Sequence, residues 1–172
     1  MRTRPEIYFL EVSRAIAKHP LSADEGLALR QEYKYKLVGS EPEPVASVVE
    51  WGQWFEAADR KVALTQVKNR VYISTVFLGI DHAFGGRLPL LFETMVFGGR
   101  CNGFCFRCST SEQAAEVHIV VVEALFRIER VPRWYRSRTR STFSAVRGWA
   151  HRRDMELFPR ELSLDAAELQ DV

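Results

Sequence analysis

The strongest constraint on the fold is a series of short apolar segments separated by turns in the middle of the chain. Residues 61–67 alternate apolar and polar side chains, and Val71–Leu78 is rich in Val, Ile, Thr and Tyr. Lys68-Asn69 lies between them as a tight turn, which predicts an antiparallel hairpin. Leu90–Phe97 predicts the next strand, and Phe104–Arg107 predicts a short further one.

A helix is predicted over residues 110–130. Ser109 and Glu112 form an S-x-x-E capping box, and the apolar positions that follow fall on one broad helical face. Pro132 interrupts this helix, and a further helix is predicted over roughly 133–153. We therefore expect an α+β fold, in which an antiparallel sheet of about four strands carries the 110–130 helix on one face.

Ahead of this core we predict an N-terminal helical hairpin. One helix covers 5–19 and a second runs from Ser22 towards Leu37 and ends at Gly39. The sequence GSEPEP at 39–44 is typical of a linker, and Val45–Val49 suggests a short strand. The expected segments are a helical hairpin at 1–40, an α+β core at 45–130, and a basic helix with an acidic tail at 131–172.

Composition places the chain among proteins that build a packed core. Apolar residues make up 47% of the 172 residues, and no apolar run approaches the roughly 18–20 residues that span a bilayer. The first residues show no apolar segment typical of a secretory signal. We expect a cytoplasmic protein with no membrane partner.

Charge is distributed unevenly along the chain, although the net charge is only +2. Residues 127–153 hold nine arginines and one glutamate, and residues 154–172 hold six acidic residues and one arginine. A basic segment followed by an acidic tail is typical of an interaction region, or of a surface that neutralises itself.

Part of the chain resembles a family of small proteins encoded by bacteriophages and prophages, whose function is not assigned. The likeness is carried by four blocks: WGQWFEAADR (51–60), ISTVFLGIDH (73–82), LPLLFETMVFGG (88–99) and RCSTSEQAAEVH (107–118). The chain departs from the usual family pattern at Leu88, Cys108 and Val117. The resemblance implies a bacterial host as the setting, and it implies no mechanism.

Asp81, His82, Glu93 and His118 are the candidates for acid–base catalysis or for binding a divalent metal. If the strand continues through Asp81-His82, these two side chains point to opposite faces of the sheet and cannot share one ion. On the structural interpretation, which we prefer, Asp81 caps the turn and His82 bonds nearby backbone. His118 is then a satisfied histidine that packs the helix on the sheet.

The segment CNGFCFRC places Cys101, Cys105 and Cys108 at the spacing C-x3-C-x2-C. Zinc bound by these thiolates and His118 is one possibility, and an iron–sulfur cluster is another. The default interpretation is three free thiols, so no cofactor is predicted.

Arginine alternates with aromatic and hydroxyl side chains in the segment from Phe126 to Arg153. Arginine binds phosphates in a bidentate manner, and aromatic rings stack on bases, so this composition is typical of an RNA- or single-strand-binding surface. The alternatives are an acidic protein face as target, or pairing of the segment with the chain's own acidic tail. The candidate binding residues are Arg133, Trp134, Tyr135, Arg136, Arg138, Arg140, Arg147, Trp149 and Arg152.

The chain has no P-loop, no G-x-S-x-G, no H-E-x-x-H and no dinucleotide-binding fingerprint. The preferred hypothesis is a non-enzymatic phage or prophage protein that binds a host protein or protein–nucleic-acid complex and alters its activity, as inhibitors of CRISPR immunity do. A small metal-dependent hydrolase or nuclease and a direct DNA- or RNA-binding regulator are the alternatives.

Overall fold

The computed structural model describes residues 4–22, 33–83 and 88–150, and it has the expected α+β architecture. Its main sheet has four strands in the order β3-β4-β5-β6, and every neighbouring pair is antiparallel. The strands are β3 (Lys61–Lys68), β4 (Val71–Phe77), β5 (Phe92–Phe97) and β6 (Cys105–Cys108). The predicted sheet of about four antiparallel strands is therefore confirmed.

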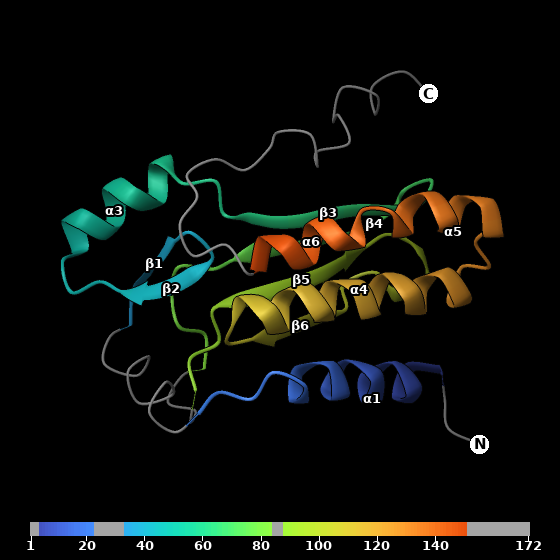
Figure 1. Cartoon of the computed structure of the whole chain (residues 1–172), viewed down its shortest axis with the longest axis horizontal. Coiled ribbons are helices and arrows are strands. Elements are labelled where there is room, and N and C mark those ends of the chain that lie inside the picture. The colour runs from blue at the N-terminus through green and yellow to red at the C-terminus, as the bar shows by residue number, and fades with distance from the viewer. Residues whose placement is uncertain (1–3, 23–32, 84–87, 151–172) are drawn as a thin grey trace.

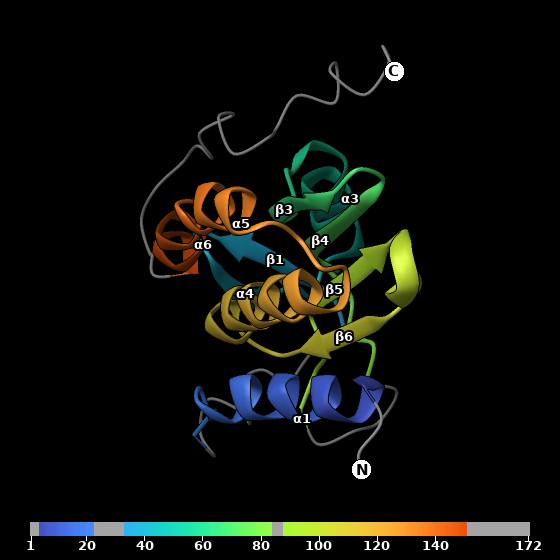
Figure 2. The same ribbon diagram turned by 90° about the vertical axis from the view of Figure 1, so that its right-hand side faces the viewer.

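Helix α4 (Ser111–Ile128) lies across the sheet and contacts all four strands. Its N-cap is Thr110, whose hydroxyl accepts from the backbone N–H of Gln113, while the Gln113 side chain accepts from the Thr110 N–H. This reciprocal pair is a capping box, and it lies one residue after the predicted box of Ser109 and Glu112. Helix α1 (Arg4–Ala17) lies along one flank of α4, and α6 (Phe143–Ala150) lies along the other (Figures 1 and 2).

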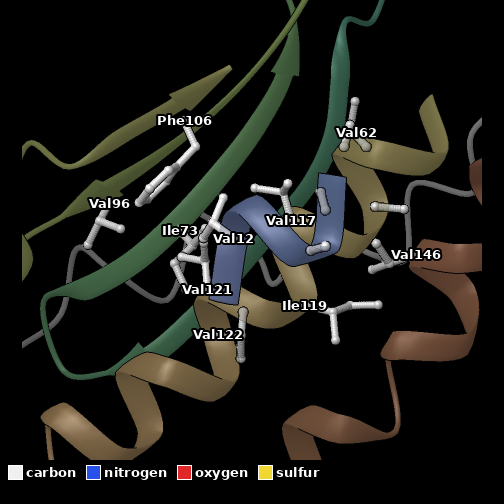
Figure 3. Packing of buried hydrophobic residues seen from close by; sticks show 14 of the residues in the cluster. Val12, Val62, Ile73, Val96, Phe106, Val117, Ile119, Val121, Val122 and Val146 are labelled. Atoms are coloured by element: carbon white, nitrogen blue, oxygen red, sulfur yellow. The ribbon is translucent and has the colours of Figure 1, made fainter. Parts of the chain in front are cut away.

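The core lies between α4 and the inner face of the sheet. Figure 3 shows Val12 of α1 and Val121 of α4 beside Ile73 of β4, with Val146 of α6 at the right of the same cluster. Full burial of one such side chain stabilises the fold by about 1.5–3 kcal/mol, so this shared cluster is the main source of stability. Because α1, the sheet and α6 contribute to one core, the described parts of the three predicted segments pack together.

The N-terminal half differs from prediction in two places. Residues 23–32 of the predicted second helix lie outside the described residues, and Tyr35–Val38 is strand β1 rather than the end of a helix. The predicted linker contains strand β2 (Glu41–Pro44), which pairs with β1. Tyr35 explains the difference: its side chain is fully buried, and its N–H donates to Gly79 O at the end of β4.

Helix α3 (Val48–Ala57) occupies the region where a strand at Val45–Val49 was predicted. Ser47 caps this helix, because its hydroxyl accepts from the N–H of Glu50 at 3.2 Å. The Trp51 indole donates to Gly79 O at 2.9 Å and fastens α3 beside the end of β4. The local cap and the indole contact outweigh the β preference of the valines.

The basic segment after α4 forms two short helices, α5 (Arg133–Arg140) and α6 (Phe143–Ala150), where one helix was predicted. The part of the predicted extension beyond residue 150 lies outside the described residues. Of the helices that are described, none has the length and apolar character needed to cross a bilayer.

Candidate binding interface

His118 lies in the core and not at a surface site. Its Nε2 is 2.8 Å from Thr65 Oγ1 and its Nδ1 is 2.8 Å from Thr75 Oγ1, and Thr75 is in turn 2.8 Å from Thr94 Oγ1. The imidazole is fully buried, and burial lowers its pKa from 6.5 to about 3. A neutral ring, with one nitrogen donating and the other accepting, therefore joins α4 to three strands, as the structural interpretation predicts.

Asp81 closes the turn that follows β4. Its Oδ1 accepts from the backbone N–H of Ala83 at 2.7 Å and from the N–H of Leu90 at 2.9 Å. A carboxylate that accepts from two backbone groups holds the two ends of this loop together, and so the predicted capping role of Asp81 is confirmed. His82 is half-buried beside it, and its N–H donates to Leu90 O at 3.2 Å.

Glu93 lies on the opposite face of the sheet from His118. Its Oε2 is 2.8 Å from both Nε and Nη2 of Arg107 on the neighbouring strand. The adjacent residue, Thr94, is the one whose side chain points inward to the histidine network. The four candidate catalytic residues are thus split between the core, a turn and the outer face.

The three cysteines do not converge either. Cys105 is exposed and Cys108 is buried, because an odd spacing along β6 sends them to opposite faces. Burial raises the pKa of Cys108 strongly, while burial and a hydrogen bond to Glu93 raise the pKa of Cys105 to about 11. Across the described part of the chain, no group of three His, Cys, Asp or Glu side chains is placed to hold a metal ion.

Three of the candidate arginines are engaged inside the molecule. Arg136 Nε donates to Val131 O at 2.6 Å, and its Nη2 donates to Phe126 O at 3.0 Å. Phe126 O lies in the last turn of α4 and also accepts from the Val131 N–H, whereas Val131 O lies just beyond the helix and accepts from Arg136. Arg136 therefore acts as a side-chain cap that fixes the corner between α4 and α5.

Arg140 and Arg147 pair with acidic residues on the exposed side of α4. Arg140 donates from Nε and Nη2 to the two carboxylate oxygens of Glu123 at 2.5 and 2.7 Å, and Arg147 Nε donates to Glu116 Oε1 at 2.7 Å. The basic segment is thus partly neutralised within the protein. The partners that the structure describes are on α4, whereas the acidic tail, the predicted alternative partner, lies outside the described residues.

The remaining candidates on α5 face outward. The Trp134 side chain is 71% exposed, and Arg133 and Arg138 on the same short helix are exposed without an ion pair to any described residue. Tyr135 anchors the helix from below, since its hydroxyl donates to Gln66 O of β3 at 3.3 Å and its ring meets Trp134 edge-on at 5.7 Å between centroids. We call Arg133, Trp134 and Arg138 the α5 face.

The side chain of Trp149 and the whole of Arg152 lie outside the described residues. Three exposed arginines on loops near the start of α5 were not predicted, and they are Arg70, Arg100 and Arg130. Arg70 and Arg100 are single charges on segments far apart in the sequence and give no local composition signal, whereas Arg130 lies in the basic segment 127–153 but was not among the named candidates. An Asn-Arg pair in a tight hairpin turn, where Asn-Gly is usual, was the one available hint.

Comparisons of this chain with family models, with curated proteins and with solved structures give no match. The resemblance to phage-encoded proteins therefore remains a prediction.

Proposed function

We propose that the protein is a phage or prophage accessory protein that binds a host defence or nucleic-acid-handling complex in the bacterial cytoplasm and modulates it. The observation that carries this proposal is the α5 face, where an indole that is 71% exposed lies between two arginines without described ion-pair partners. Exposed Trp and Arg side chains are the residue types most often found at energetically dominant positions of interfaces.

The way α5 is held supports a binding role. Tyr135 bonds the backbone of β3, and Arg136 bonds the carbonyls at the end of α4. The helix is therefore fixed on its inner side while its outer side chains are presented to solvent. A prearranged surface loses little conformational entropy when it binds, which favours affinity.

The positive charge of the α5 face suits an acidic target, which is the phosphate backbone of a nucleic acid or an acidic face of a host protein. Such complementarity speeds association and makes it sensitive to salt. The phage context of the proposal is supported by the sequence resemblance alone. For the metal-dependent hydrolase, the described residues offer no ligand cluster that favours it.

Affinity capture from a bacterial host lysate tests the proposal. The tagged wild type is compared with Arg133→Glu/Arg138→Glu, which reverses the charge of the α5 face without touching the cap formed by Arg136. Arg14→Glu/Lys61→Glu is the matched control, because it makes the same change in net charge at exposed positions on α1 and β3. We expect a specific host complex to be lost from the first variant and retained by the second, and equal capture by both variants refutes the proposal.

A further inference from the structure

Three loops meet at one end of the molecule, which Figure 2 views directly. They are the turn between β3 and β4, the loop between β5 and β6, and the corner between α4 and α5. Gly98 and Gly99 lock them together. A Cβ at Gly98 would lie 1.8 Å from Arg70 O, and one at Gly99 would lie 2.7 Å from Glu129 Oε1 and 3.0 Å from Val71.

The same contact is reinforced by a hydrogen bond, since the Arg100 N–H donates to Glu129 Oε1 at 2.9 Å. The positions of the three loops relative to one another are therefore fixed by close backbone packing. We call the exposed side chains of these loops the loop face.

Two arginines of the loop face have an unfavourable backbone conformation. Arg70 has φ 58° and Arg130 has φ 55°, and they are the only two non-glycine residues with positive φ in the part of the chain that the structure describes. A Cβ makes this left-handed region costly, and glycine or asparagine is the usual occupant.

Both positions are places where glycine is expected. Arg70 is the second residue of the two-residue turn between Lys68 and Val71, which are paired in the sheet. Arg130 follows the C-cap of α4, where Val131 N–H donates to Phe126 O at 3.0 Å in the usual glycine-containing helix ending. Two neighbouring positions have a strained backbone, and both are arginine. This points to a role for the arginine side chain itself.

The loop face is strongly basic. The exposed cations of the loop face are Arg70, Arg100 and Arg130, and Lys68 at the end of β3 and Arg133 at the start of α5 lie directly beside it in the sequence; none of the five has an ion pair with any described residue. The nearby carboxylate of Glu129 accepts the Arg100 N–H, keeps its negative charge and offsets one of these five positive charges. The uncompensated charge is therefore available to phosphate groups, which guanidinium binds bidentately.

Aromatic rings border the loop face. Trp134 is one residue beyond Arg133, and Tyr72 and Phe97 stack at 5.1 Å between centroids where β4 begins and β5 ends. Tyr72 is 39% exposed. Cations beside exposed aromatic rings are what proteins use to bind single strands, where bases are free to stack.

We propose that the loop face binds the phosphate backbone of single-stranded nucleic acid through Arg70, Arg100 and Arg130, with Trp134 as an adjacent stacking platform. This inference rests on the proposed function and deepens it, because it names the chemistry of the target. The two left-handed arginines give it a test in which stability and affinity change in opposite directions.

The test is Arg70→Gly/Arg130→Gly, measured by thermal unfolding and by fluorescence anisotropy with labelled oligo-dT and oligo-U of about 16 nucleotides. We expect Tm to rise by about 2–4 °C, since glycine removes the steric cost at both positions. Affinity should fall about tenfold near 50 mM salt. The plot of log affinity against log salt should become shallower by about 1.4, because each phosphate that an arginine neutralises on a single strand contributes about 0.7 to the slope.

Arg70→Lys/Arg130→Lys retains the charge and should keep the salt slope, and Arg14→Gln/Lys61→Gln removes two charges elsewhere and should leave binding unchanged. Arg70→Asn/Arg130→Asn is the second test variant, because asparagine also tolerates the left-handed region. If the Gly and Asn variants both bind as the wild type does, or if both are less stable than it, the inference is wrong.

The outcome also separates this inference from the proposed function. Capture of a host protein that depends on Arg133 and Arg138, together with no affinity for either oligonucleotide, overturns the single-strand inference and leaves the accessory function standing. That result assigns the basic surface to an acidic protein face. Equal capture by the α5 variant and its control overturns the proposed function whatever the oligonucleotides do.

Discussion

His118 should make the stability of this protein depend steeply on pH below neutrality. The ring is fully buried between α4 and the sheet, both of its nitrogens bond to threonine hydroxyls, and burial lowers its pKa from 6.5 to about 3. The folded protein keeps the ring neutral, while the unfolded chain protonates it as pH falls through 6.5. The unfolded state therefore binds more protons between these two pKa values, so the free energy of unfolding decreases as pH falls through that window.

The size of the effect follows from the difference between the two pKa values. One pKa unit corresponds to about 1.4 kcal/mol, so the shift from 6.5 to about 3 amounts to about 5 kcal/mol when the window has been crossed. At pH 4 about 3 kcal/mol of it has been lost. Domains of this size have a total stability of about 5–15 kcal/mol, so a change of this size is readily measured.

His118→Leu isolates this contribution, because it removes the titrating group and leaves every other carboxylate and histidine in place. At pH 7.5 the variant should be less stable by about 1–3 kcal/mol, since the Thr65 hydroxyl loses its partner while Thr75 keeps Thr94. By pH 4 the wild type should have lost this advantage, and the two proteins should be equal in stability or reversed in order.

Urea denaturation of both proteins at several pH values between 4 and 8 provides the measurement. The informative quantity is the difference in free energy of unfolding between wild type and variant, because acid effects common to both cancel. A difference that stays constant over this range would show that His118 is not held neutral in the fold, and would contradict the assignment of the residue to the core.

Three further outcomes follow from the geometry. Arg136→Ala should lower the free energy of unfolding by about 1–3 kcal/mol in chemical denaturation, because Val131 O loses its donor and Phe126 O keeps only the Val131 N–H. Arg140→Ala, which breaks an exposed ion pair, should cost at most about 1 kcal/mol. Gly98→Ala should abolish or severely impair folding, since its Cβ would lie 1.8 Å from a backbone oxygen. Gly103 also has positive φ, but a Cβ added there would meet no atom within 4 Å. Gly103→Ala should therefore lower the free energy of unfolding by only about 1–2 kcal/mol in the same assay. Cys105 should be the thiol alkylated fastest in the native protein, and slowly below pH 9, because its pKa is raised to about 11; equal labelling of the buried thiols in mass spectrometry would contradict this.

The sheet and its covering helix were predictable because their patterns are local. Alternation over residues 61–67 predicted β3 (Lys61–Lys68), and the richness of Val71–Leu78 in Val, Ile, Thr and Tyr predicted β4 (Val71–Phe77), both almost to the residue. The start of α4 is less determined, since the sequence STSEQ contains two overlapping capping boxes. The capping box that forms is the one with Gln113, and the Gln113 side chain also makes a distant contact, since its nitrogen donates to His19 O at 2.8 Å.

Strand β1 was not predicted because tertiary contacts, and not a pattern in its own sequence, hold it in place. The segment Tyr35–Val38 has no strong period of its own, and it is held by the burial of Tyr35 and by the hydrogen bond to Gly79. The turn into β2 uses Gly39 at φ 63°, and prolines are tolerated in β2 because it is an edge strand of a two-stranded sheet.

The sequence predicted which segment contains the candidate interface, but it did not predict all of the side chains that are exposed there. Arginine and tryptophan enrichment identified the segment that contains α5. Which guanidinium groups remain available depends on Glu116 and Glu123, which lie about two turns apart on another helix and pair with Arg147 and Arg140. The strained backbone of Arg70 was hinted at only by the Asn-Arg pair in its turn, and that of Arg130 by nothing local, because backbone φ is set here by the packing of three loops.

The outward side of α5 should contact a partner, and site-specific photo-crosslinking in a bacterial host is the experiment that decides this. Benzoylphenylalanine replaces Trp134 in one variant and Val49 of α3 in the other, since these side chains are exposed to the same extent, 71% and 70%. We predict an adduct with a host macromolecule from position 134 and none of that mass from position 49. Adducts of equal yield from both positions, or from position 49 alone, would contradict the claim.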